Sequence, residues 1–170
     1  MGARKTFDWN GYAAKDYQGI ADWHVADAKA WGWNAIRLNI LASNTISWSY
    51  AAVYGFDALF TYVDSLVKEC ASQRIVGMLD MHDGLQIADT FTPESNQVEK
   101  DVANFLARTA VMYKTNPYVW FSLANEPPYI NDEWYKMSDY YANIVRSQGV
   151  KNIIVLYSPV WGQDIGSQSP

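Results

Sequence analysis

The chain has 170 residues, of which 49% are apolar and 18% are charged, and its formal net charge is −5. This composition is typical of one globular domain with a substantial core and excludes a largely disordered chain. The acidic balance argues against a nucleic-acid-binding surface, which needs a basic stripe. We therefore expect residues 1–170 to form a single domain that binds no nucleic acid.

Several other classes of function lose support from what the sequence lacks. Cys70 is the single cysteine, so no intrachain disulfide can form, and no C-x-x-C or His-rich cluster predicts a metal site. No apolar run approaches the about 18 residues of a membrane span. No signal peptide is recognisable after Met1, although a leader could have been removed. We expect a soluble chain with no metal, no cofactor and no membrane partner.

Helical and strand patterns alternate along the chain. Apolar residues at helical spacing predict helices over 20–32, 56–73, 97–114 and 133–148. Short apolar runs between them predict strands over 34–40, 75–83, 118–127 and 151–159. Strands that alternate with helices of this length form a parallel sheet in the α/β class, with right-handed crossovers. Two architectures fit, a (β/α)₈ TIM barrel and an open, doubly wound sheet of the flavodoxin type.

Polar side chains gather where the predicted strands end, and the carboxyl ends of strands carry function in both architectures. These side chains are Arg37 and Asn39 in the first strand, Asp80, His82 and Asp83 at the end of the second, Asn125 and Glu126 at the end of the third, and Trp161, Gln163 and Asp164 past the fourth. No Gly-rich phosphate loop follows any strand, which weakens the nucleotide-binding form of the open sheet.

Aromatic residues are the unusual part of the composition, with eight Trp and twelve Tyr. A core of this size needs fewer, although most single Trp residues still belong to a core or an interface. Amphipathic rings suit a partner that is apolar on one face and hydroxylated on the other. A sugar fits that description.

Four segments together resemble successive strands of the glycoside hydrolase family 5 cellulases, which are retaining (β/α)₈ enzymes. The segments read IRLNI, GMLDMHD, WFSLANEP and NIIVLYSPVWGQDI. The resemblance extends from about Trp23 to Pro170 and covers roughly strands two to five of the family barrel. It implies a β-glycan as substrate, hydrolysis of β-1,4-glucan or a related polymer with retention, and secretion to the extracellular space.

The resemblance also implies a role for each matching residue. Glu126 matches the general acid/base and Asn125 the residue that binds the sugar 2-hydroxyl. Arg37 matches an arginine that orients the second carboxylate, His82 a sugar-binding histidine and Trp161 an aromatic residue near the cleft. Each residue also has a purely structural alternative, in which Arg37 pairs with Asp80 inside the sheet and His82 is a hydrogen-bonded core histidine.

A retaining glycosidase needs two carboxyl groups about 5 Å apart. The family's nucleophilic glutamate, which ends the seventh strand, is not recognisable in this sequence. We therefore expect half of a barrel, closed by a homodimer in which Asp80 or Asp83 of a second copy approaches Glu126. A non-catalytic sugar-binding module and an assembly unit remain as alternatives.

Overall fold

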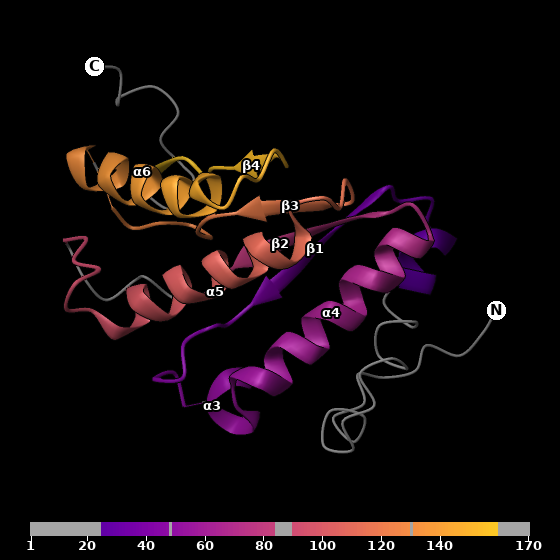
Figure 1. Cartoon of the computed structure of the whole chain (residues 1–170), viewed down its shortest axis with the longest axis horizontal. Helices are drawn as coiled ribbons and strands as arrows, with labels where there is room; N and C mark the ends of the chain where they lie inside the picture. The colour runs from indigo at the N-terminus through magenta and orange to yellow at the C-terminus, as the bar shows by residue number, and fades with distance from the viewer. Residues whose placement is uncertain (1–24, 48, 84–89, 130, 160–170) are drawn as a thin grey trace.

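A computed structural model describes residues 25–47, 49–83, 90–129 and 131–159 (Figure 1). Residues 25–30 are helical and precede the first strand. The elements that follow are β1 (Ala35–Ile40), α3 (Tyr50–Tyr54), α4 (Phe56–Ser72), β2 (Val76–Met81), α5 (Gln97–Tyr113), β3 (Val119–Ser122), α6 (Asn131–Ser147) and β4 (Ile154–Val155).

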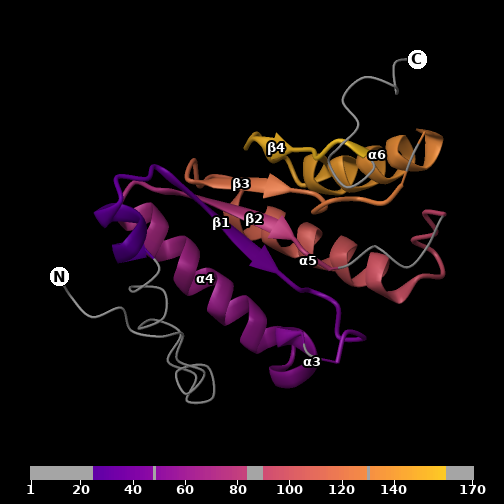
Figure 2. The same cartoon turned by 180° about the vertical axis from the view of Figure 1, so that it is seen from behind.

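The four strands pair in chain order, β1-β2-β3-β4, and every pair is parallel. The long helices α4, α5 and α6 cover one face of this sheet. In Figure 1 α5 lies in front of β2, and in Figure 2, seen from behind, β2 lies in front of α5. A doubly wound sheet reverses its strand order and carries helices on both faces. The structure therefore excludes the flavodoxin-like alternative and confirms the predicted half of a (β/α)₈ barrel.

Capping residues and apolar stripes explain where the helices form. The Asn96 side chain caps α5 by accepting hydrogen bonds from the backbone N–H groups of Val98 and Glu99. The Ser49 hydroxyl caps α3 in the same way through Ala52 N–H. Helix α4 buries one side of its surface, formed by Leu59, Phe60, Val63, Leu66, Val67 and Cys70. This stripe at helical spacing faces the sheet.

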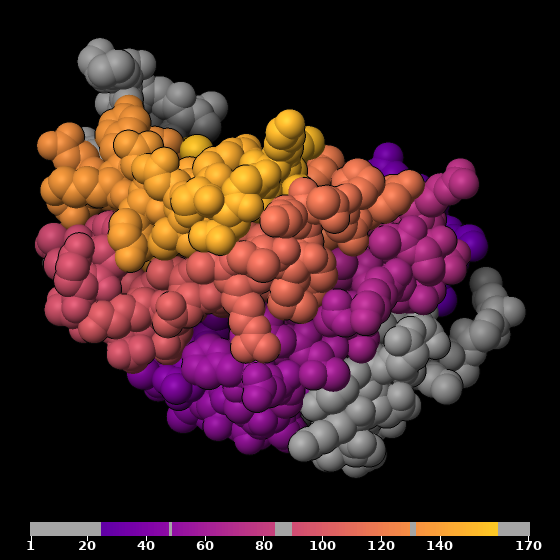
Figure 3. Space-filling view, in the orientation of Figure 1, coloured from indigo at the N-terminus to yellow at the C-terminus, as the bar shows by residue number. Residues whose placement is uncertain are grey.

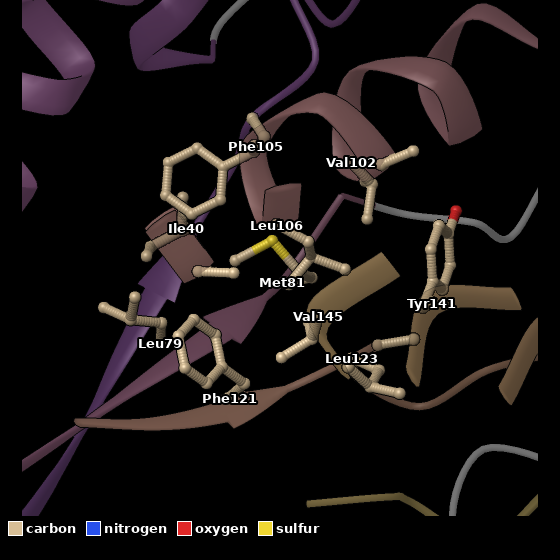
Figure 4. Close-up of a cluster of buried hydrophobic side chains, with 14 of the residues drawn as sticks. Ile40, Leu79, Met81, Val102, Phe105, Leu106, Phe121, Leu123, Tyr141 and Val145 are labelled. Atoms are coloured by element: carbon tan, nitrogen blue, oxygen red, sulfur yellow. The ribbon is translucent and has the colours of Figure 1, made fainter. Parts of the chain in front are cut away.

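The core lies between the sheet and the helices (Figure 4). Side chains from the strands meet side chains from α5 and α6 there. The strand side supplies Ile40, Leu79, Met81, Phe121 and Leu123, and the helix side supplies Val102, Phe105, Leu106, Tyr141 and Val145. Figure 3 shows α4, α5 and α6 packed side by side over the outer face of this core. The opposite face of the sheet carries no helix from the described part of the chain.

The predicted elements are present, with differences at their ends. The fourth strand is limited to Ile154–Val155, because it pairs only with β3 through Phe121 and Ser122. The short helix α3 was not predicted, because five residues are too few to show a helical period. Among the described residues, no helix has the length and apolar character that crossing a membrane requires.

Candidate active site

The face of the sheet opposite the helices α4, α5 and α6 becomes polar toward its carboxyl edge. In β1, Leu38 and Ile40 point into the core whereas Arg37 and Asn39 are exposed, as the alternation of side chains along a strand requires. The register then pairs Asn39 with Asp80 and Asp80 with Ser122. Neighbouring strands therefore bring polar side chains together at one edge.

Asp80 is the centre of this cluster. It is 0% exposed, and its Oδ2 accepts from Arg37 Nη2 at 2.8 Å and contacts His82 Nδ1 at 3.1 Å. Its Oδ1 accepts a hydrogen bond from Ser122 Oγ at 2.6 Å. A buried carboxylate is costly unless it is paired and hydrogen-bonded, and here β1, β3 and the residue after β2 supply the groups that satisfy it.

Asn125 and Glu126 follow β3 at the same edge. The Asn125 N–H donates to Met81 O at 2.7 Å and so extends the pairing of β3 with β2. Arg37 Nη2 donates to Asn125 Oδ1 and links this loop to Asp80. Glu126 is exposed and has a φ of 44°, in the left-handed region that glutamate rarely adopts. Such backbone strain persists where the surroundings fix it, and it is common at functional sites.

Tyr157, after β4, completes the group. Its ring lies 5.1 Å from the Arg37 guanidinium carbon, in a cation–π contact. Burial raises the pKa of the Tyr157 phenol, and the negative charges of Asp80 and Glu126 raise it further, whereas Arg37 lowers it. Tyr157 therefore remains protonated at neutral pH and can donate a hydrogen bond to a ligand.

Buried carboxylates hold the loops around this edge. Asp83 accepts from the N–H groups of Ala42 and Ser43 at 2.7 and 2.5 Å. Asp101 accepts from Ser43 Oγ at 2.8 Å and from Asn44 N–H at 3.2 Å. The loop after β1 is therefore fixed by Asp83, which follows β2, and by Asp101 of α5. Two further carboxylates hold the segment before α5, since Glu99 accepts from Thr92 N–H and Tyr129 OH, and Glu133 accepts from Phe91 N–H.

The anchoring of this loop should depend on pH. Burial raises the pKa of Asp83 from 3.8 to about 6, against the opposing effect of its hydrogen bonds from Ser43 and Ala42. The folded state therefore favours the protonated acid, so the stability that Asp83 contributes is present below about pH 4 and is lost as the pH rises through about 6. We expect Asp83→Asn to become more stable relative to the wild type by about 3 kcal/mol over that range. Urea unfolding of both proteins between these pH values measures the difference, and a difference independent of pH would contradict the assignment.

The structure brings together four of the residues that the sequence singled out, namely Arg37, His82, Asn125 and Glu126. Trp161 lies outside the described residues. The pairing of Arg37 with Asp80 is present, and Arg37 also reaches Asn125. Sequence reasoning missed Ser122 and Tyr157 as members of the cluster. The alternation along β3, which places Ser122 opposite Asp80, was the signal for the first.

Asp80 and Asp83 do not fit the role of a nucleophile supplied to a second copy. They are 0% and 2% exposed, and each already accepts hydrogen bonds within its own chain. Glu126, in contrast, is exposed at this edge. In the described ranges, no three His, Cys, Asp or Glu side chains come together in a way that could hold a metal ion.

A groove of about 740 Å³ runs along the free edge of β1. It meets the cluster at Arg37 and Asn39, and its far end is lined by Trp31 and Trp33, which are 68% and 56% exposed. The chemistry of the site does not lie at that end, because both tryptophans precede β1 and so lie toward the amino edge of the sheet. The groove marks an edge of the sheet that has no partner strand in the described part of the chain.

The family model "Cellulase (glycosyl hydrolase family 5)" matches residues 2–169. No curated protein matches the chain at a significant level.

Solved structures match the fold at low sequence identity. "Cellulase Cel5C_n" is 22% identical with a TM-score of 0.66, and the match covers 89% of this chain and 46% of that one. A thermostable, halotolerant GH5 cellulase from an Icelandic hot spring isolate is 21% identical with a TM-score of 0.65, covering 86% and 44%. XacCel5A, solved in complex with cellopentaose, is 20% identical with a TM-score of 0.61, covering 77% and 42%. The chain thus spans less than half the length of these structures.

Proposed function

Because the chain belongs to the cellulase family, glycosyl hydrolase family 5, we propose that it acts on β-1,4-glucan or a related β-glycan with Glu126 as the general acid/base. The observation that carries the proposal is the position of Glu126. It is exposed at the carboxyl edge on strained backbone, directly after an Asn125 that is linked through Arg37 to Asp80 and His82. The solved complex of XacCel5A with cellopentaose supports the substrate class.

In the proposed reaction Glu126 protonates the glycosidic oxygen as the bond to the leaving sugar breaks, and then accepts a proton from the attacking water. Asn125 and His82 hold sugar hydroxyl groups beside it. Arg37 belongs to the same polar wall, and Trp161 is proposed as an aromatic contact for the sugar on the grounds of its family match alone. Secretion is proposed on the same grounds.

A retaining mechanism also needs a nucleophilic carboxylate about 5 Å from Glu126. Asp80 and Asp83 are buried and hydrogen-bonded within their own chain, so neither fits that role. We expect slow turnover by the chain alone. A sugar-binding module without turnover is the second candidate, and the burial of both aspartates is the observation that favours it.

Release of reducing ends from carboxymethyl cellulose, with Glu126→Gln as the control, tests the hydrolase. Titration with soluble glucan, followed by Trp fluorescence, tests the binding module. Turnover that depends on Glu126 supports the first, and saturable binding without turnover supports the second. If the protein shows no turnover and no glucan binding, the assembly unit is the remaining candidate function.

We further propose that the half-barrel is a homodimer in which the free edge of β1 pairs with β4 of a second copy. Neither edge has a partner strand among the described residues, and both carry exposed apolar side chains, with Trp31 and Trp33 beside β1 and with Ile153 and Leu156 at β4, 51% and 48% exposed. Open strand edges and apolar patches of this kind favour pairing with another chain. A two-fold axis would then close eight parallel strands.

Light scattering tests the dimer. The expected mass is twice the 19.3 kDa of one chain. Ile153→Asp should shift the protein to a monomer, because it places a charge in the contact. Val111→Asp is the matched control, since Val111 is 53% exposed on α5, which lies over β2 in the middle of the sheet (Figure 1). A wild-type monomer, or an equal effect of both variants, would contradict the dimer.

A further inference from the structure

Asp80 cannot itself contact a ligand in the cleft. It is 0% exposed, and its oxygens are occupied by Arg37, His82 and Ser122. Two of these three neighbours nevertheless reach the open face, since the side chains of Arg37 and His82 are each 36% exposed. Asp80 therefore acts on the surface of the site only through the groups that it holds.

The first group held in this way is the Asn125 amide. Arginine carries only hydrogen-bond donors, so the Asn125 atom that faces Arg37 has to be the oxygen, Oδ1. The amide nitrogen, Nδ2, is then left as the donor on the other side of the group. Arg37 is itself fixed by Asp80 Oδ2 at 2.8 Å. Asp80 thus determines, through Arg37, which end of the Asn125 amide is available.

The second group is the His82 imidazole. An ionised carboxylate only accepts hydrogen bonds, so His82 Nδ1, 3.1 Å from Asp80 Oδ2, has to carry a proton. In the neutral ring the other nitrogen, Nε2, is then an acceptor. Asp80 therefore also determines the tautomer of His82.

We propose that Asp80 is a positioning residue that sets a donor at Asn125 Nδ2 and an acceptor at His82 Nε2, a pair that suits the hydroxyl groups of a sugar. A hydroxyl group both donates and accepts, so one donor and one acceptor on the protein match two hydroxyls of a glucan ring. This inference rests on the proposed function for the identity of the ligand. The tautomer and the amide orientation follow from the protein alone.

The histidine tautomer gives a readout that a merely structural role would not change. The chain has two histidines, His24 and His82, and a His24→Gln variant identifies the signals of each. Long-range ¹H–¹⁵N spectra at about pH 8.5, where an ordinary imidazole is neutral, report which ring nitrogen carries the proton. We expect His82 in the wild type to be protonated at Nδ1. Protonation at Nε2 would overturn the proposal, whatever any variant does.

Asp80→Ala should release both groups, because it removes the two oxygens that accept from Arg37, His82 and Ser122. We expect His82 to change to a mixture of tautomers and cellopentaose affinity to fall about tenfold. Asp101→Ala is the matched control, because Asp101 is also a buried aspartate, 3% exposed, that accepts bonds from Ser43, Asn44 and Gln97. It should leave the His82 tautomer unchanged.

The two readouts separate this inference from the proposed function. A tautomer change in Asp80→Ala without cellopentaose binding by either protein would retain the positioning role and contradict the glycan site. Cellopentaose binding with an unchanged tautomer in Asp80→Ala would retain the glycan site and overturn the positioning role.

Discussion

Replacing Glu126 with glutamine is expected to lower the rate of β-1,4-glucan hydrolysis by about 10²- to 10⁴-fold, the usual contribution of general acid–base catalysis. Glutamine preserves the shape of the side chain but cannot transfer a proton to the leaving oxygen. Because Glu126 is exposed, the substitution should leave the fold intact. Reducing ends released from carboxymethyl cellulose by the two proteins, at equal concentration, measure the effect.

The control is Glu94→Gln, which removes an exposed glutamate before α5 and should leave the rate unchanged. A second substrate tests the role itself. A dinitrophenyl cellobioside has a leaving group that departs without protonation, so the loss of the acid should slow its cleavage much less than that of cellulose. An equal loss on both substrates, or a wild-type rate in Glu126→Gln, would contradict the assignment of Glu126 as the acid.

Phe121→Ala is expected to destabilise the fold by about 3–5 kcal/mol, the range for truncating a buried phenylalanine. Phe121 is 0% exposed, and its side chain lies in the core among Leu79, Leu123 and Val145 (Figure 4). Helices α5 and α6 surround the space, so the cavity cannot close without moving them. A domain has about 5–15 kcal/mol of stability in total, so this variant should lose a large share of it.

Urea unfolding followed by Trp fluorescence measures this loss. Val111→Ala is the control, because Val111 is 53% exposed on α5 and alanine is the better helix former. Val111→Ala should leave the free energy of unfolding unchanged. A loss below about 1 kcal/mol in Phe121→Ala would show that β3 does not pack as described. The variant also bears on the site, because Phe121 precedes the Ser122 that donates to Asp80.

The sequence predicted the fold well where apolar periodicity is strong. Helices α4 and α5 begin at the predicted residues Phe56 and Gln97. Their buried apolar stripes are long, and Gly55 and Asn96 precede their first residues. The fourth strand was predicted over nine residues and occupies two. Apolar residues continue through that segment, but hydrogen-bonded pairing needs a neighbour, and a pattern within one segment carries no information about which neighbours exist.

The location of the candidate site could be predicted from the sequence, but the hydrogen bonds and ion pairs around Asp80 could not. Parallel strands bring their carboxyl ends to one edge, so the approach of Arg37, His82, Asn125 and Glu126 followed from the order of elements. The central role of Asp80 did not follow from the order of elements. It depends on strand register, because a slip of one residue would turn Asp80 toward the core. Tyr157 joins only because the loop after β4 turns its ring over Arg37.

The most direct test of the account is a titration of the ¹⁵N-labelled protein with cellopentaose, followed through ¹H–¹⁵N spectra. We predict chemical-shift changes centred on Arg37, His82, Asn125 and Glu126, the residues of the carboxyl edge that are exposed or only partly buried. Changes that are absent at these residues, or that appear only at the amino edge around Trp31 and Trp33, would contradict the assignment of this cluster as a glycan site.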